Sequence, residues 1–299
     1  MNRGNLSAAA AYVLWGLLPL YWKALVDVPA LEILAHRMVW SLAVVLGLLA
    51  LRRHWGWLGP ALRNRRILLT YVTSALLLAL NWYLYIWAVN ANHIVETSLG
   101  YFINPLVNVL LGVLFLKERL RLGQGLAIGI AAAGVLYLTV TFGSLPWIAL
   151  TLAGTFGVYG LLRKTAALES LEGLTLETLV LMPAALIYLL ALEFQGRGAF
   201  GHSGAGTSLL LAGAGIATAT PLLLFAVGAR RITMTTLGLL QYFAPTIQLL
   251  LGVLLYHEVV TPEKLVGFAL IWLALGVYSA EGVLRSRRAR SAAISTAKG

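Results

Sequence analysis

Ten long apolar segments, joined by short connections, follow one another along this 299-residue chain. About 20 mostly apolar helical residues cross a hydrocarbon core roughly 30 Å thick. Charged residues make up only 11% of the sequence and hydrophobic residues 60%, whereas soluble domains carry about 25% charged residues. A soluble core cannot absorb so much apolar surface, so we predict an all-α integral membrane protein. The expected spans are residues 6–25, 30–51, 67–90, 97–116, 122–140, 145–162, 174–193, 207–228, 233–256 and 264–284.

The placement of Lys and Arg predicts the orientation of these spans. If the connection between the second and third spans is cytoplasmic, only Lys23, Arg37, Arg197 and Lys264 of the 22 basic residues fall on the outer side. Short cytoplasmic loops are enriched in Lys and Arg, so both termini should be cytoplasmic in a bacterial inner membrane. The net charge of +11 then needs no nucleic-acid partner, and we expect a monomer in the lipid bilayer.

An internal repeat relates the two halves of the chain. Residues 105–118 match residues 245–258 at seven of fourteen positions, beginning with Pro105 and Pro245 and ending with Glu118 and Glu258. Each half, 1–142 and 143–299, holds five predicted spans, so the second half must enter the membrane from the opposite side. Inverted repeats of this kind recur in secondary transporters, where they surround a central site. We therefore expect two inverted five-helix repeats around a central cavity.

Enzymatic function is not supported by any motif in the chain. The sequence has no G-x4-G-K-[ST] phosphate loop and no H-E-x-x-H zinc motif. The only aspartate, Asp27, lies in a predicted loop, and cysteine is absent. We predict that the chain is not an enzyme and binds no cofactor or metal; a channel, a scramblase or a receptor remains an alternative to a carrier.

Polar and aromatic side chains recur at helical spacing inside several spans and are the candidate substrate ligands. Unpaired amides are costly in hydrocarbon, so they must face a cavity or other helices. Two interpretations stay open: the amides line a cavity, or they join helices by hydrogen bonds. The candidate substrate-binding residues are Trp15, Asn81, Trp82, Tyr85, Tyr101, Asn104, Asn108, Tyr159, Gln241, Tyr242 and Gln248.

Several other residues within or beside the spans have candidate roles. Pro105 and Pro245 are candidate hinges, with a static kink as the alternative. Gly125 and Gly129 predict close helix packing within the monomer. Glu118 is expected in a solvated loop. A further set combines acidic and basic groups near the outer ends of spans, either as a gate or proton site or as a static ion pair: Glu32, His36, Arg37 and Glu96.

Seven short motifs resemble the drug/metabolite transporter superfamily with two EamA-type repeats, and within it the RarD-type branch. They are Tyr-Trp-Lys at 21–23, Glu-Ile-Leu-Ala-His-Arg at 32–37, Asn-Trp at 81–82, Trp-Ala-Val-Asn at 87–90, Ser-Leu-Gly-Tyr-Phe-Ile-Asn-Pro at 98–105, Leu-Arg-Lys at 162–164 and Leu-Gln-Tyr at 240–242. The resemblance implies a ten-helix basket whose cavity is lined by spans 1, 3, 4, 6, 8 and 9, with the fifth and tenth spans at the periphery. Related members of the YddG type export aromatic amino acids.

The substrate expected from these residues is a small neutral metabolite, namely an amino acid with aromatic ones favoured. Amide and hydroxyl groups suit the charged end of a zwitterion, and aromatic rings suit its side chain. The candidate stripes carry no Lys or Arg at mid-depth, which argues against phosphorylated substrates. Export of a neutral drug is the alternative that the same lining allows.

Overall fold

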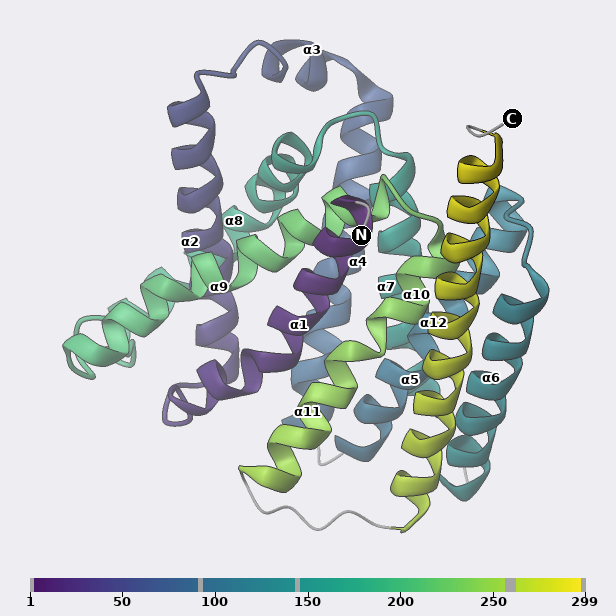
Figure 1. The fold of residues 1–299 in the computed structure, drawn as a ribbon. Helices are drawn as coiled ribbons and strands as arrows, with labels where there is room; N and C mark the ends of the chain where they lie inside the picture. Colours follow the sequence, from purple (N-terminus) through teal and green to yellow (C-terminus); the bar gives the residue numbers. More distant parts are fainter. Residues whose placement is uncertain (1–2, 91–93, 143–145, 256–261, 297–299) are drawn as a thin grey trace.

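The protein, described here by a computed structural model, is built from α-helices. Its described backbone covers residues 3–90, 94–142, 146–255 and 262–296; within these ranges, the side chains of residues 89–90, 94–96, 98, 142, 264 and 282–296 are not described. Twelve helices occupy these ranges, and no strand occurs in them (Figure 1). They are α1 (Arg3–Lys23), α2 (Ala30–Arg52), α3 (Leu58–Arg63), α4 (Arg65–Asn90), α5 (Ile94–Leu116), α6 (Leu122–Phe142), α7 (Trp147–Thr165), α8 (Ser170–Phe194), α9 (Ala205–Ala229), α10 (Met234–Gln241), α11 (Phe243–Leu254) and α12 (Pro262–Thr296).

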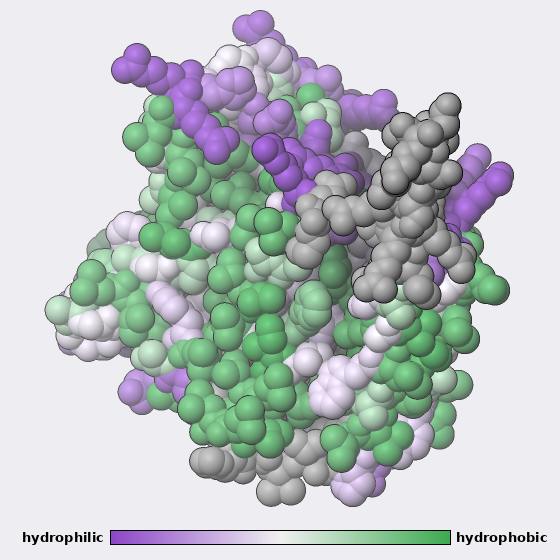
Figure 2. Space-filling model, in the orientation of Figure 1, coloured by the Kyte–Doolittle hydropathy of each residue, from purple (hydrophilic) through white to green (hydrophobic). Residues whose placement is uncertain are grey.

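Seven helical segments in the described ranges are long and apolar enough to cross a membrane. They lie in α2, α4, α5, α6, α8 and α9, and the seventh runs through α10 and α11 together. Figure 2 shows apolar residues covering the middle of the visible face, while hydrophilic residues gather at the upper end, over α3 and the start of α1. We call this upper end the basic end, and the opposite end, where α1 stops at Lys23, the far end. The chain is a multi-span membrane protein.

The predicted span 233–256 corresponds to the apolar segment Met234–Leu254, in which the helix is interrupted. Helix α10 stops at Gln241, and α11 starts at Phe243. Pro245 accounts for the break, because a proline cannot bond the carbonyl four residues earlier, here that of Gln241, and its ring clashes with that carbonyl. Its repeat partner Pro105 lies inside the uninterrupted α5, so the same residue type breaks one span and not the other.

Helices of the two halves interleave. Helix α5 packs against α7 and α10, α1 packs against α9 and α11, and α2 packs between α8 and α9. Helix α4 lies against α7 and α8, while α6 and α12 run side by side at one edge of the molecule (Figure 1). The two halves therefore share one core instead of forming two separate bundles.

Glycine permits the closest approach between two of these helices. A Cβ atom at Gly215 of α9 would lie 2.3 Å from the backbone carbonyl carbon of Trp40 in α2. The Ser41 hydroxyl donates a hydrogen bond to the Gly215 carbonyl at 3.2 Å in the same contact. By contrast, a Cβ atom at Gly125 or Gly129 would meet nothing within 4 Å. The prediction that these two glycines pack helices within the monomer is therefore wrong.

Candidate functional site

A cavity of about 170 Å³ lies within the bundle. One buried water needs only ~10–15 Å³, so this space is large enough for an organic molecule. Its walls come from α1, α2, α4, α5, α7, α10 and α11, and it extends from the middle of α1 to the far end of that helix. The lining residues are Tyr12, Trp15, Leu18, Pro19, Trp22, Arg37, Asn81, Trp82, Tyr85, Thr97, Gly100, Tyr101, Asn104, Leu152, Phe156, Gln241, Ala244, Pro245 and Gln248.

The structure gathers eight of the eleven candidate substrate-binding residues around this cavity, from five separate helices. Repeat-related positions Tyr101 and Gln241 both belong to the set. The eight are Trp15, Asn81, Trp82, Tyr85, Tyr101, Asn104, Gln241 and Gln248.

Three candidate residues lie beside the cavity instead of lining it. Asn108 is buried and donates hydrogen bonds to Gln241 Oε1 at 2.8 Å and to Asn104 Oδ1 at 3.3 Å. The hydroxyl of Tyr242 donates to the carbonyl of Phe102 at 3.2 Å. Tyr159 is buried nearer the basic end and stacks on Phe225 with 6.0 Å between ring centroids. Each of these side chains supports the packing of helices around the cavity.

One face of α1 lines the cavity from the middle of the helix to its far end, and the list of candidate ligands contained only Trp15 from it. Tyr12, Trp15, Pro19 and Trp22 all line the cavity. Their spacing of three, four and three residues places them on one side of a helix. That periodicity was the signal available in the sequence. Phe156 of α7, also not predicted, packs its ring against Trp15 with centroids 5.7 Å apart.

Some amides line the cavity and also join helices by hydrogen bonds. The two interpretations of the amides, as cavity lining and as links between helices, therefore do not exclude each other. Asn81 Nδ2 of α4 donates to the Leu152 carbonyl at 2.8 Å and to Thr155 Oγ1 at 2.9 Å, both in α7. Gln248 Nε2 of α11 donates to the carbonyl of Trp15 at 3.4 Å. A side chain whose donor is fixed in this way presents a preset polar surface to a ligand, because it has little freedom to turn away.

Arg37 is the one charged side chain among the described residues of the cavity wall, and the sequence analysis had placed it in a gate near the outer end of a span. Its guanidinium contacts the rings of Trp22 and Trp82, with its central carbon 4.8 Å and 4.6 Å from the ring centroids. Its Nε donates a hydrogen bond to Thr218 Oγ1 of α9 at 2.9 Å. The sequence analysis expected no Lys or Arg among the polar and aromatic stripes at mid-depth. That expectation is incomplete, because α2 places Arg37 against tryptophans of α1 and α4 in the cavity wall.

Two other members of the predicted gate, Glu32 and His36, do not line the cavity. Glu32 and His36 are buried one turn apart on α2, with 3.9 Å between Glu32 Oε1 and His36 Nε2. The same oxygen accepts a hydrogen bond from the backbone N–H of Ala199 at 2.6 Å, so the pair fastens α2 to the connection between α8 and α9. The side chain of Glu96 lies outside the described residues.

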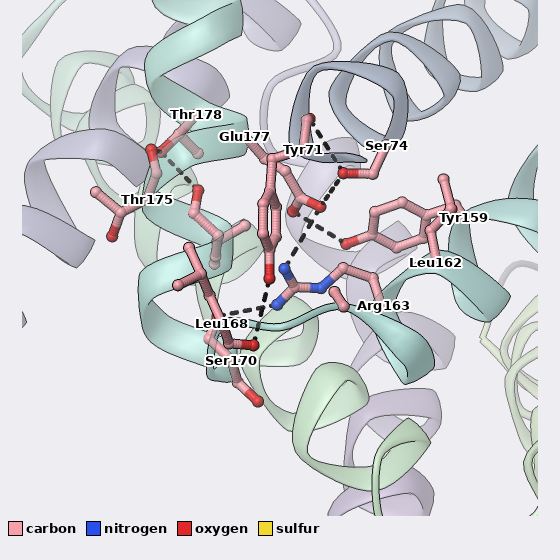
Figure 3. A network of polar contacts seen from close by, with 12 residues as sticks. Tyr71, Ser74, Tyr159, Leu162, Arg163, Leu168, Ser170, Thr175, Glu177 and Thr178 are labelled. Atoms are coloured by element: carbon pink, nitrogen blue, oxygen red, sulfur yellow. Dashed lines mark hydrogen bonds and ion pairs between the residues drawn. The ribbon is translucent and has the colours of Figure 1, made fainter. Parts of the chain in front are cut away.

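A buried polar network joins α4, α7 and α8 near the basic end of the bundle (Figure 3). Glu177 of α8 is fully buried and accepts hydrogen bonds from Ser74 Oγ at 2.6 Å and from Tyr159 at 3.4 Å. Arg163 of α7 pairs with the same carboxylate at 3.5 Å and donates to the carbonyl of Ser170 at 3.0 Å. This network ties the three helices together there.

A carboxylate also fixes the start of α10 at the basic end, which corrects the expectation for Glu118. Its side chain accepts hydrogen bonds from the backbone N–H groups of Met234 at 2.6 Å and Thr235 at 3.1 Å. It therefore caps a helix N-terminus, where a negative charge is stabilising, and it is not a solvated loop residue.

Comparison with known proteins gives the family. The EamA-like transporter family matches residues 2–140 and again residues 145–280. The chain belongs to the EamA-like transporter family. Within the family it is 50% identical to protein RarD of Streptomyces exfoliatus, over 96% of this chain and 91% of that protein. It is 48% identical to the uncharacterized transporter YojE of Bacillus subtilis, over 97% and 98%, and 45% identical to protein RarD of Escherichia coli, over 96% and 97%.

A solved structure shares the fold of this chain. One crystal structure superposes with a TM-score of 0.68 over 92% of this chain and 96% of that chain, at 22% sequence identity. One detail departs from what the EamA resemblance implied for the cavity. No residue of α9, which corresponds to the eighth predicted span, lines it, whereas α2 contributes Arg37.

Proposed function

We propose that this EamA-family transporter is a secondary carrier that exports small metabolites, with amino acids and above all aromatic ones as substrates. The observation that carries the proposal is the cavity lined by aromatic rings and amides within the bundle. A carrier needs a binding site that reaches one side at a time. A channel would need a continuous path to both ends in the same state.

Ten spans arranged as two inverted repeats would supply the second state. The family matches residues 2–140 and 145–280 separately, in agreement with a division near residues 142 and 143. The packing supports the same arrangement. In the proposed repeat α1 corresponds to α7, α4 to α9, and α5 to α10 and α11 together. The contact between α5 and α7 then corresponds to the contact of α1 with α10 and α11, and the contact between α4 and α7 corresponds to the contact between α1 and α9. Exchanging these related contacts closes the far end and opens the basic end.

The cavity surface suits a small molecule with a polar end and an aromatic body. Asn104 and Gln241 offer amide groups near the middle of the bundle, while Trp15, Tyr85 and Tyr101 offer ring surface. Tyr85 and Tyr101 lie edge to face, with centroids 6.1 Å apart. Aromatic pairs of this kind contribute about 0.5–1.5 kcal/mol beyond the area they bury, so a substrate ring entering the group gains affinity that an aliphatic body does not.

Counter-flow in proteoliposomes tests the carrier proposal. Vesicles loaded with unlabelled phenylalanine should accumulate labelled phenylalanine, tryptophan or methionine transiently and saturably, and chloramphenicol should be carried less well. Tyr101→Ala and Gln241→Ala should each reduce the initial rate at least about tenfold while the protein stays folded in the membrane. Movement of the drug alone would replace the amino-acid substrate by a neutral drug, and non-saturable flux of all solutes would indicate a channel.

We further propose that both termini and the basic end are cytoplasmic in a bacterial inner membrane. The distribution of Lys and Arg and the hydrophilic end in Figure 2 support this orientation. Reporter fusions after Asn64 and after Gly282 should be active in the cytoplasm, and one after Asn92 outside it. A cytoplasmic signal at Asn92 would contradict both the orientation and the inverted repeat. The proposed working unit is the monomer.

A further inference from the structure

The guanidinium of Arg37 is held in the cavity wall by neighbours that leave its binding edge unoccupied. The ring centroids of Trp22 and Trp82 lie 4.8 Å and 4.6 Å from its central carbon. Thr218 takes the Nε–H at 2.9 Å. A guanidinium carries five N–H donors, and no hydrogen bond within the described part of the chain uses the four on the two terminal nitrogens. The rings and the hydroxyl therefore hold the guanidinium in place. Its terminal N–H groups are left available to bind a ligand.

No carboxylate among the described residues lies within ion-pair distance of this cation, and none of the described lining residues is acidic. A charge inside a membrane protein is costly and is generally paired with another group or exposed to a water-filled cavity. The described part of the cavity wall thus has one formal positive charge. A monoanion neutralises it, whereas a phosphate would bring a second negative charge without a second cation to meet it.

We infer that Arg37 is the anchor for a carboxylate group of the transported molecule. Arginine binds a carboxylate through two parallel N–H···O hydrogen bonds, a geometry that lysine cannot reproduce. The aromatic and amide lining beside it then receives the body of the molecule. The ligand class is a small monocarboxylate with an apolar or aromatic body, for which an ammonium group is not required. This inference rests on the proposed function for its physiological meaning, but the binding itself does not depend on transport.

Four related ligands separate the carboxylate from the ammonium group. Phenylalanine has both groups, 3-phenylpropionate has the carboxylate alone, phenylalaninamide has the ammonium alone, and 3-phenylpropanamide has neither. Calorimetric titration of the purified full-length protein should show each carboxylate binding at least about tenfold more tightly than its amide, because charged hydrogen bonds of this kind are worth more than one factor of ten. Equal affinity of 3-phenylpropionate and phenylalanine would identify organic acids in general, and a preference for phenylalanine would identify amino acids.

Variants of Arg37 complete the test. Arg37→Gln should bring each carboxylate to the affinity of its amide, and Arg37→Lys should keep only part of the preference, since it retains the charge without the fork. Arg197→Gln is the matched control, because it removes one positive charge from an exposed connection between α8 and α9, and it should change no affinity. Size-exclusion profiles and melting temperatures establish that the variants are folded.

The inference and the proposed function fail in different ways. A carboxylate preference that survives Arg37→Gln, or the absence of any preference in the natural protein, overturns the inference even if amino acids are carried. Lack of measurable binding of both carboxylates overturns it as well. An Arg37-dependent preference without flux in proteoliposomes overturns the carrier proposal and leaves the carboxylate site in place.

Discussion

Removing the carboxylate of Glu177 should be among the most destabilising single changes in this protein. Glu177 is fully buried, and Arg163, with which it pairs, is 3% exposed. The change Glu177→Leu leaves the Arg163 cation buried without its anion. It also removes the acceptor for the hydroxyl groups of Ser74 and Tyr159, which lie 2.6 Å and 3.4 Å from the carboxylate (Figure 3).

The expected loss is about 3–5 kcal/mol, the range for breaking a buried ion pair by deleting one partner. At roughly 2–4 °C per kcal/mol, the melting temperature should fall by roughly 6–20 °C. The same reasoning predicts that Arg163→Met combined with Glu177→Leu costs less than the sum of the two single changes, because the double variant buries no unpaired charge.

Thermal unfolding of the purified protein in detergent measures these differences. Glu193→Gln is the matched control, because Glu193 also pairs with a basic group, His202 at 2.9 Å, but both side chains are more than half exposed. Exposed pairs contribute about 0–1 kcal/mol, so this variant should melt within a few degrees of the natural protein. Equal melting temperatures for Glu177→Leu and Glu193→Gln would refute the reasoning, as would strict additivity in the double variant.

Three further predictions follow from the packing. Gly215→Ala should lower thermal stability by at least about 1–3 kcal/mol, since its Cβ would lie 2.3 Å from the Trp40 backbone, whereas Gly154→Ala, whose Cβ would meet nothing within 4 Å, should leave it unchanged or slightly raised. Glu118→Ala should cost about 1–2 kcal/mol through loss of the α10 cap, and an unchanged melting temperature would contradict that role. Pro245→Ala returns an N–H that can bond the Gln241 carbonyl and should slow counter-flow with ligand affinity retained; unaltered counter-flow would mean that the break in α10–α11 is a static kink.

The sequence by itself determined the class of the protein and the types of residue in its site. Runs of about 20 apolar residues allow little besides membrane-spanning helices, because each backbone polar group must find its partner within the segment. The spacing of Tyr101 and Asn104, for example, put the pair on one face of a helix. Such periodicity is local, and local periodicity is readable without a structure.

Tertiary structure decided how these faces meet and what else enters between them. Asn108 and Gln241 are far apart in sequence, and both were predicted to line the cavity. In the structure Gln241 lines it, and Asn108 lies behind Gln241 and donates a hydrogen bond to its side chain. Glu118 became a helix cap because α10 begins beside it. The sequence could not show these contacts, since they depend on the relative placement of helices from different halves.

Arg37 shows the same division most clearly. Its position in a predicted span was readable from the sequence, and so was the presence of tryptophans in other spans. Only the packing of α1, α2 and α4 brought its guanidinium against Trp22 and Trp82 and into the cavity wall. Apolar periodicity tells which face of a helix avoids lipid. The direction in which a long charged side chain extends depends instead on which neighbours remove water from it and which pair with it. That choice is made by the assembled bundle.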